Sequence, residues 1–254
     1  MAIAFVNTIS KSGTHLGMRC ISLFPGMSLG AICPGPYPYL SPDHSRHHLA
    51  EVLNKLAKGG YFCGHVAYRK EIARALDLAG VRTVLVVRDP RDVLVSTMMW
   101  IDDFKEHSLH DFFKNIPGTT EKLALLITGS KSLDVSGLIV PSLASLYRRF
   151  SPWLLQTNSL AVRYESLIGE PGGGSRASQC REIAKIAQHL SFPRTKKIID
   201  EVSFRVQESS SAYNRDPDNY NRGRIGIWRD HFTSELENLF VQCVGPTSVE
   251  WGYV

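Results

Sequence analysis

The chain has 254 residues, of which 43% are hydrophobic and 21% are charged, so it can bury the core of one sizeable α/β domain. Its formal net charge of +5 favours anionic ligands. It contains no long Lys/Arg run and no basic stripe interleaved with aromatic residues, the usual marks of a nucleic-acid surface. A small anionic ligand is therefore the preferred interpretation, and nucleic acid the alternative.

The cysteines and the apolar runs indicate the cellular compartment of the protein. Five cysteines, an odd number without C-x-x-C spacing, argue against a disulfide framework or a zinc site and indicate a reducing compartment. Five apolar residues stand between Met1 and Asn7 without a basic segment, which is typical of a buried first strand and not of a signal peptide. No apolar stretch approaches the roughly 18 residues that span a bilayer. We expect a soluble cytoplasmic protein without a membrane span.

Short apolar runs and helical patterns alternate along the chain. The runs that are typical of buried parallel strands are residues 3–6, 61–63, 83–87 and 160–162. The helical patterns cover residues 13–23, 45–58, 70–79, 90–101, 142–150 and 178–190. This alternation predicts an α/β fold of three layers, P-loop-like, with a central parallel β-sheet flanked by helices. We expect a single domain over residues 1–254.

Three segments interrupt the alternation. Residues 33–39 contain three prolines, each of which removes a hydrogen-bond donor and fixes φ, so they exclude regular helix or strand. Residues 170–175 are glycine-rich and predict a flexible connection. Residues 102–142 have weak periodicity and predict a lid or insertion over the sheet edge.

A phosphate-binding loop is predicted where the first strand meets the first helix, in Ser10-Lys11-Ser12-Gly13-Thr14-His15. N–H groups at a helix start and the helix dipole favour an anion. Gly13 permits close approach of the backbone, Ser12 and Thr14 add hydroxyl donors, and Lys11 adds a mobile cation. Lys11 precedes Gly13, unlike the G-K-[ST] order of nucleoside triphosphatases, which argues against a kinase or ATPase. The alternative is a plain N-cap by Ser10 or Ser12.

A second anion site is predicted after residues 83–87, in Arg88-Asp89-Pro90-Arg91-Asp92 and the nearby Ser96. Asp89 as N-cap, Pro90 in the first turn and Asp92 closing a capping box explain most of this segment as a helix start. They do not explain Arg88 at the strand end or Ser96 on the helix. The planar guanidinium of Arg88 is suited to bidentate phosphate binding.

A third basic segment lies near the end of the chain, in Asn221-Arg222-Gly223-Arg224-Ile225-Gly226-Ile227-Trp228. It is a basic loop broken by glycines, and on its own it is equally typical of a surface turn.

Together the three segments resemble the binding signature of sulfotransferases that use 3′-phosphoadenosine-5′-phosphosulfate (PAPS). The resemblance covers residues 3–232 as ordered islands. It implies that Lys11, Ser12, Gly13, Thr14 and His15 contact the cofactor around its 5′-phosphate. It also implies that Arg88 and Ser96 hold the 3′-phosphate, with Arg222 and Gly223 closing over it from the other side.

Two further pairs match the family's adenine-binding residues. Ser203-Phe204 resembles its Ser-Phe pair, whose ring stacks on the base, and Tyr164-Glu165 resembles its Tyr-Glu pair, in which Tyr faces the nucleotide. Each aromatic alone is more typical of a core residue. The chain departs from the family at Leu16, where many relatives have an aromatic, and at Asn221, where they have Arg.

His65 is the candidate general base. It follows the apolar run 61–63, so it is expected at the carboxyl edge of the sheet, where ligands bind in open α/β folds. An imidazole titrates near neutrality and can take a proton from an acceptor hydroxyl. The resemblance implies this role for Gly64-His65. Cys63 stands where some relatives have a Lys, so Lys11 would stabilise the charge of the transferred group largely alone.

The run Asp43-His44-Ser45-Arg46-His47-His48 invites a metal interpretation, because His44 and His48 share a helix face. No H-E-x-x-H pattern accompanies it, so a solvated helix start or substrate-facing lid is favoured, and the expected chemistry needs no metal.

The resemblance implies transfer of a sulfuryl group from PAPS to a hydroxyl or amine of a small-molecule acceptor, with His65 as the base. The alternatives are a P-loop small-molecule kinase and a binding module without catalysis. Acceptor specificity is expected from residues 34–48 and 102–142, and from the aromatic residues Tyr37, Tyr39, Phe104 and Trp153. Residues 229–238 match the family's dimer segment only in part, so the oligomeric state stays open.

Overall fold

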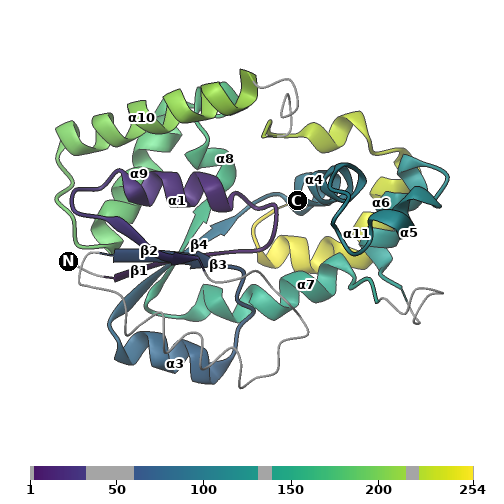
Figure 1. Ribbon diagram of the computed structural model, residues 1–254, viewed down its shortest axis with the longest axis horizontal. Helices are drawn as coiled ribbons and strands as arrows, with labels where there is room; N and C mark the ends of the chain where they lie inside the picture. The colour runs from purple at the N-terminus through teal and green to yellow at the C-terminus, as the bar shows by residue number, and fades with distance from the viewer. Residues whose placement is uncertain (1–2, 33–59, 131–138, 216–222, 254) are drawn as a thin grey trace. The chain divides into compact units, whose positions relative to one another are not determined.

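The computed structural model describes residues 3–32, 60–130, 139–215 and 223–253 (Figure 1). The chain forms two compact units. The first comprises Met1–Arg88 and Pro152–Ile225, and the second comprises Asp89–Ser151 and Gly226–Val254. Neither unit is continuous in sequence.

The first unit is built on a five-stranded sheet in the order β2-β3-β1-β4-β5, in which every neighbouring pair is parallel. Its strands are β1 (Ile3–Thr8), β2 (Ser28–Ile32), β3 (Gly60–Gly64), β4 (Val81–Val87) and β5 (Ser159–Arg163). Four of the strands contain the predicted apolar runs, and the predicted central parallel sheet is confirmed. β2 was not predicted, because its sequence Ser-Leu-Gly-Ala-Ile has no continuous apolar run.

Helices cover both faces of this sheet. One face carries α1 (Thr14–Ser22), α8 (Tyr164–Leu167), α9 (Arg176–His189) and α10 (Lys196–Arg215), and the other carries α3 (Lys70–Leu78) (Figure 1). The predicted layers of helix, sheet and helix are therefore present. None of the helices in the described ranges is long and apolar enough to cross a membrane.

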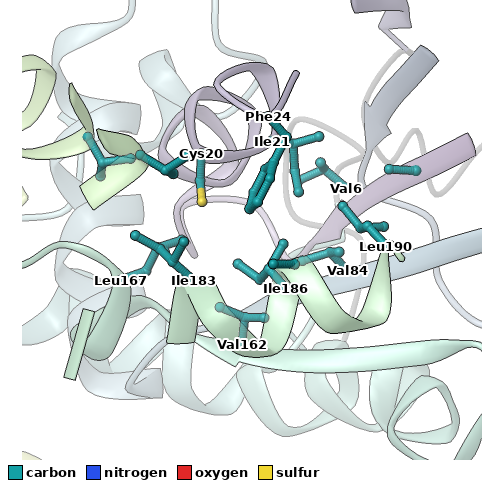
Figure 2. Close-up of a cluster of buried hydrophobic side chains, with 14 of the residues drawn as sticks. Val6, Cys20, Ile21, Phe24, Val84, Val162, Leu167, Ile183, Ile186 and Leu190 are labelled. Atoms are coloured by element: carbon teal, nitrogen blue, oxygen red, sulfur yellow. The ribbon is translucent and has the colours of Figure 1, made fainter. Parts of the chain in front are cut away.

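Side chains alternate between the two faces along each strand, as the pleat requires. Val6, Val84 and Val162 lie on the face that packs against Ile21 of α1 and Ile183 of α9 (Figure 2). Burying such a side chain contributes about 1.5–3 kcal/mol.

The aromatic residues of β1 and β3 lie on the opposite face of the sheet. Phe5 stacks on Phe62 with ring centroids 4.6 Å apart, and Trp153 meets Phe5 edge-on at 6.4 Å. Trp153 is fully buried, and its indole nitrogen donates to the carbonyl of Val66 at 2.9 Å. The prediction of Trp153 as an acceptor contact is therefore wrong, because the ring is part of the core.

The glycine-rich segment 170–175 is ordered, not a flexible connection as predicted. It contains the 3-10 helix η2 (Glu170–Gly172), and the amide of Gly174 donates to the carbonyl of Gly169 at 2.8 Å. Gly169 has φ of 70°, and a side chain there would collide with Gln179. The glycines therefore serve a tight turn.

The second unit is helical in its described residues. It contains α4 (Pro90–Asp103), α5 (His110–Lys114), α6 (Thr119–Thr128), α7 (Leu143–Phe150), the short η4 (Ile227–Asp230) and α11 (Ser234–Glu250). The 3-10 helix η1 (Ser151–Leu155) begins at Ser151, where the first segment of this unit ends, and its other residues belong to the first unit. Tyr147 and Trp251 meet edge-on at 4.9 Å in its core. Within the segment 102–142, for which a lid was predicted, α5 and α6 bury Phe113 and Leu123.

Candidate active site

The predicted site residues of the first unit follow the carboxyl ends of its strands. In the sheet register Asn7 lies opposite Gly64, Thr8 opposite Val86, and Val87 opposite Arg163. Consequently the loop after β1, His65 after β3, Arg88 after β4 and Tyr164 after β5 all leave the same edge. The connection that leaves β1 leads to β2 on one side of it, and the connection that leaves the adjacent β3 leads to β4 on the other side; such a switch point is where open α/β sheets bind ligands.

The loop between β1 and α1 has the backbone of an anion-binding turn. The amide of Ser12 donates to the carbonyl of Ile9 at 3.0 Å, and Lys11 has φ of 68°, which is uncommon for a residue with a side chain. Gly13 has φ of 107° at the N-cap of α1 and offers no side-chain cap, so the first amides of the helix are not covered by it.

Gly13 has a second reason to be glycine. A Cβ at this position would overlap the ring of Tyr164, which packs directly against the loop. The loop residues differ in exposure, since Ser12 is 1% exposed whereas His15 is exposed. The Ser12 hydroxyl has no hydrogen-bond partner among the described residues.

His65 is held through one ring nitrogen by the last residue of β1. Its Nδ1 lies 2.9 Å from the carbonyl oxygen of Thr8 and 2.9 Å from the Thr8 hydroxyl. A carbonyl only accepts hydrogen bonds, so this contact assigns the hydrogen to Nδ1 and leaves Nε2 as the basic nitrogen. The Thr8 hydroxyl also lies 2.7 Å from the hydroxyl of Thr14 in the anion-binding loop.

The backbone beside His65 is fixed by a buried amide. The Asn7 side chain, 0% exposed, accepts from the Val66 amide at 2.9 Å and donates to the Val66 carbonyl at 3.0 Å. The indole of Trp153 donates to the same carbonyl. These hydrogen bonds fix the backbone at Val66 and thereby the position of the neighbouring His65.

Burial lowers the pKa of His65, and the positive charges of His15 and Lys11 lower it further, while the Thr8 carbonyl opposes the shift. The ring is therefore neutral at neutral pH. A neutral imidazole with its lone pair on Nε2 is competent to accept a proton.

Arg88 lies between the loop and the third basic segment. It is 3% exposed, and its guanidinium donates to the carbonyls of Lys11 at 3.2 Å and Arg224 at 3.3 Å. Its Cζ also lies 4.4 Å from the centroid of the Tyr164 ring, within cation–π distance. Arg88 therefore joins two segments that lie far apart in the sequence.

Tyr164 and η2 fix the third segment in the first unit. The Tyr164 hydroxyl donates to the carbonyl of Gly223 at 2.7 Å, and the amide of Ile225 donates to the carbonyl of Gly172 at 3.0 Å. Arg222 and Asn221, as well as His44, His47 and His48, lie outside the described residues. So do Tyr37, Tyr39 and the predicted helix 45–58.

Asp92 and Ser96 lie on α4 in the second unit. Asp92 was interpreted as a capping residue, but its fully buried carboxylate accepts from the amides of Gly226 at 2.8 Å and Trp228 at 3.1 Å. Asp89 caps the helix as predicted, by accepting from the amide of Arg91 at 2.9 Å. Ser96 is 8% exposed.

Ser203 and Phe204 lie on α10 and differ in environment. The Ser203 hydroxyl is fully buried and donates to Oε1 of Gln179 at 2.6 Å, whereas the Phe204 ring is 53% exposed. The adenine-contact role therefore suits the Phe204 ring, and the Ser203 hydroxyl secures α10 to α9.

Asn7 and Thr8 were not predicted as site residues. The signal that could have found them is the pair of polar side chains continuing the buried run 3–6, directly before the phosphate loop. The sequence around Gln179 and Asp92 contains no such signal, because their hydrogen-bond partners belong to helices and loops that are distant in the sequence. Within the described ranges, no group of three or more His, Cys, Asp or Glu side chains is placed to hold a metal ion.

Comparison with known proteins adds a family and a fold. A family model described as the sulfotransferase domain matches residues 65–247, and it leaves the phosphate loop outside the matched range. A search of curated proteins finds no sequence relative of this chain.

Solved structures of low sequence identity share the fold. The chain is similar to mouse sulfotransferase SULT7A1 complexed with PAP, with a TM-score of 0.68 and 16% identity, covering 100% of this chain and 89% of that one. It is also similar to retinol dehydratase in complex with androsterone and the inactive cofactor PAP, with a TM-score of 0.59, 14% identity and coverage of 96% and 80%. The same enzyme in a complex with retinol and PAP gives a TM-score of 0.59 at 15% identity.

Proposed function

The chain belongs to the sulfotransferase domain family, and on that premise we propose that it transfers a sulfuryl group from PAPS to a hydroxyl or amine of a small-molecule acceptor. The observation that carries the proposal is that Thr8 contacts both His65 and Thr14, which joins a candidate base to a loop suited to anions. The family match does not favour the kinase alternative.

The residues of the loop fit the phosphosulfate end of PAPS. A buried Ser12 hydroxyl without a partner in the described part of the chain suits an anion that accepts its hydrogen. The amides of Gly13 and Thr14 would hold the 5′-phosphate, with the Lys11 ammonium supplying positive charge. His15 is exposed beside them, in the role at the 5′-phosphate that the family resemblance implies.

The nucleotide end would be held by the elements around Arg88. We assign the 3′-phosphate to Arg88 with Arg222 and Gly223, and we retain Ser96 in the same predicted role. Phe204 supplies a ring for the adenine. Tyr164 supports the site by packing against Gly13 and by fixing Gly223.

The chemistry requires one proton acceptor. Bound PAPS supplies the sulfuryl group, and the acceptor oxygen or nitrogen forms a bond to sulfur as the bond from sulfur to the 5′-phosphate oxygen breaks. His65 takes the acceptor's proton on Nε2, while Nδ1 keeps its hydrogen on the Thr8 carbonyl. Lys11 and the loop amides stabilise the negative charge that develops on the leaving phosphate oxygen.

The acceptor class is proposed from the comparisons. Retinol dehydratase is known in complexes with androsterone and with retinol, which are small molecules. Phe104 of the predicted acceptor segment is 44% exposed and stacks on Trp100, so it presents an aromatic surface. We propose a single sulfotransferase domain over residues 1–254, since the family match runs through both units. The four described cysteines form no disulfide, which supports a cytoplasmic location.

The test is a transfer assay with PAPS labelled with radioactive sulfur and a panel of phenols, alcohols and amines. The expected result is labelled product from at least one acceptor, with stoichiometric PAP. ATP with magnesium serves as the control donor. Phosphorylated product from ATP would replace this proposal with a kinase, and nucleotide binding without product from any acceptor would favour a binding module.

A further inference from the structure

We propose that Thr8 is a positioning residue that couples the base to the anion-binding loop through its hydroxyl. The inference rests on the proposed function, because it takes His65 as the base and the loop before α1 as the site of the transferred group. The Thr8 hydroxyl lies between the Nδ1 of His65 at 2.9 Å and the hydroxyl of Thr14 at 2.7 Å. Thr8 is 0% exposed, so water does not compete for these bonds.

The Thr8 carbonyl decides the direction of this chain of hydrogen bonds. It lies 2.9 Å from Nδ1 and only accepts, so Nδ1 carries a hydrogen. A protonated Nδ1 cannot accept a hydrogen bond from the Thr8 hydroxyl. Nδ1–H therefore donates a bifurcated hydrogen bond to the carbonyl oxygen and the hydroxyl oxygen of Thr8. The hydrogen of the Thr8 hydroxyl is then directed to Thr14.

The same logic continues into the loop. Thr14 accepts from Thr8, so its own hydrogen is left to be donated to a further acceptor. Thr14 is the first residue of α1, beside the amides that favour an anion. Every hydrogen of the chain thus runs from His65 toward the loop, and an anion that accepts from Thr14 completes it.

This direction has a consequence for the base. Hydrogen bonds in a chain polarise one another, by perhaps 10–30% per bond. An anion on Thr14 strengthens the bond from Thr8, which makes the Thr8 oxygen a better acceptor for the Nδ1 hydrogen. The Nδ1–H form of His65, and the imidazolium formed when Nε2 takes a proton, are both stabilised. The base is therefore prepared by occupancy of the loop.

The test compares Thr8→Val, which removes the hydroxyl but keeps the carbonyl and the shape, with Thr8→Ser, which keeps both. We expect Thr8→Val to lower kcat about three- to tenfold, the effect of one neutral hydrogen bond, with KM for PAPS and PAP affinity unchanged. Thr8→Ser should restore kcat to within about twofold of the wild type. Thr83→Val is the matched control, since Thr83 on neighbouring β4 is also 0% exposed and its hydroxyl has no partner among the described residues.

The double variant with His65→Ala separates positioning from a structural role. If Thr8 acts through His65, Thr8→Val causes no further loss of residual turnover once His65 is Ala. A loss that persists in that background, or a Thr8→Val enzyme equal to Thr83→Val, would overturn the inference. If Thr8→Val does not fold, Thr8→Ala takes its place in the same comparison.

The failures of the two proposals are distinguishable. Absence of sulfuryl transfer by the wild-type enzyme would contradict the proposed function. An unimpaired His65→Ala enzyme would remove His65 as the base, and an impaired His65→Ala with normal Thr8→Val would overturn this inference alone. NMR of the His65 ring nitrogens gives an independent reading: we expect the Nδ1–H tautomer, and an Nε2–H tautomer would reverse the direction of the chain.

Discussion

The two pairs of strand ends at the carboxyl edge of the sheet hold their functional groups differently. After β1 and β3, the imidazole of His65 is held by Thr8, through both its hydroxyl and its carbonyl. After β4 and β5, the side chains of Arg88 and Tyr164 donate to main-chain carbonyls of the flanking loops. The first arrangement orients a reactive ring, and the second fixes backbone. Substitutions at the first should therefore change turnover, and substitutions at the second should change nucleotide affinity.

The largest expected effect is that of His65→Ala. Loss of a general base costs roughly 10²–10⁴-fold in rate, so kcat should fall by that factor while PAP affinity stays within about threefold of the wild type. Steady-state kinetics measures kcat, and calorimetry measures the affinity for PAP. His189→Ala is the control, because His189 bonds the Thr83 carbonyl near the start of β4 and should leave turnover intact. Turnover retained in His65→Ala would mean that another group is the base.

Arg88→Ala should act on affinity. The guanidinium is predicted to bind the 3′-phosphate and also fixes two loops, and a hydrogen bond to a charged group contributes about 1.5–3 kcal/mol. We expect PAP to bind about ten- to a hundredfold more weakly, with a much smaller change for AMP. Arg82→Ala, at an exposed position of the same strand, is the matched control. Equal losses of affinity for PAP and AMP would show that Arg88 does not bind the 3′-phosphate.

Tyr164→Phe should have a smaller effect of the same kind. It keeps the ring that packs on Gly13 and removes the hydroxyl that donates to the Gly223 carbonyl. Leaving this buried carbonyl without its donor should lower the free energy of unfolding by about 1–3 kcal/mol and weaken PAP only a few-fold. Thermal unfolding measures the stability and calorimetry measures the PAP affinity. The control is Tyr68→Phe, at a tyrosine whose ring meets Trp153 edge-on at 5.3 Å. A loss of kcat without a loss of affinity would contradict the division of roles.

The smallest expected effect is on the pH profile. Burial and the charges of His15 and Lys11 lower the pKa of His65, so the acidic limb of kcat/KM should lie below pH of about 6.5, the ordinary value. Activity is lost as pH falls through the lowered pKa, because the protonated ring cannot accept a proton. His15→Gln should move the limb toward higher pH, and His189→Gln, whose imidazole bonds the Thr83 carbonyl near the start of β4, should not. A limb above the ordinary value would contradict a buried base.

Local pattern predicted four strands of the first unit and helices of both units. The apolar runs identified β1, β3, β4 and β5, and five of the predicted helices correspond to α1, α3, α4, α7 and α9. Thr233 has the sequence context of a helix cap, and its hydroxyl accepts from the amide of Leu236 at the start of α11. These features depend on residues close together in the sequence, which is why periodicity and capping rules find them.

The parts that were missed depend on distant partners. β1 extends past the apolar run because Asn7 and Thr8 bond to residues 57 to 59 positions away. Asp92 has the sequence context of a cap, yet its carboxylate bonds amides 134 and 136 positions away. Polar side chains in such places look like strand ends or caps until the fold brings their partners to them.

The proposed nucleotide site is tested most directly by calorimetric titration of the wild-type protein with PAP, with AMP and ATP as controls. We expect tight binding of PAP that depends on its 3′-phosphate, and weaker binding of AMP and ATP. Equal affinity for PAP and AMP, or a preference for ATP, would contradict a site formed by the loop after β1 and Arg88 after β4 for a PAPS-derived nucleotide.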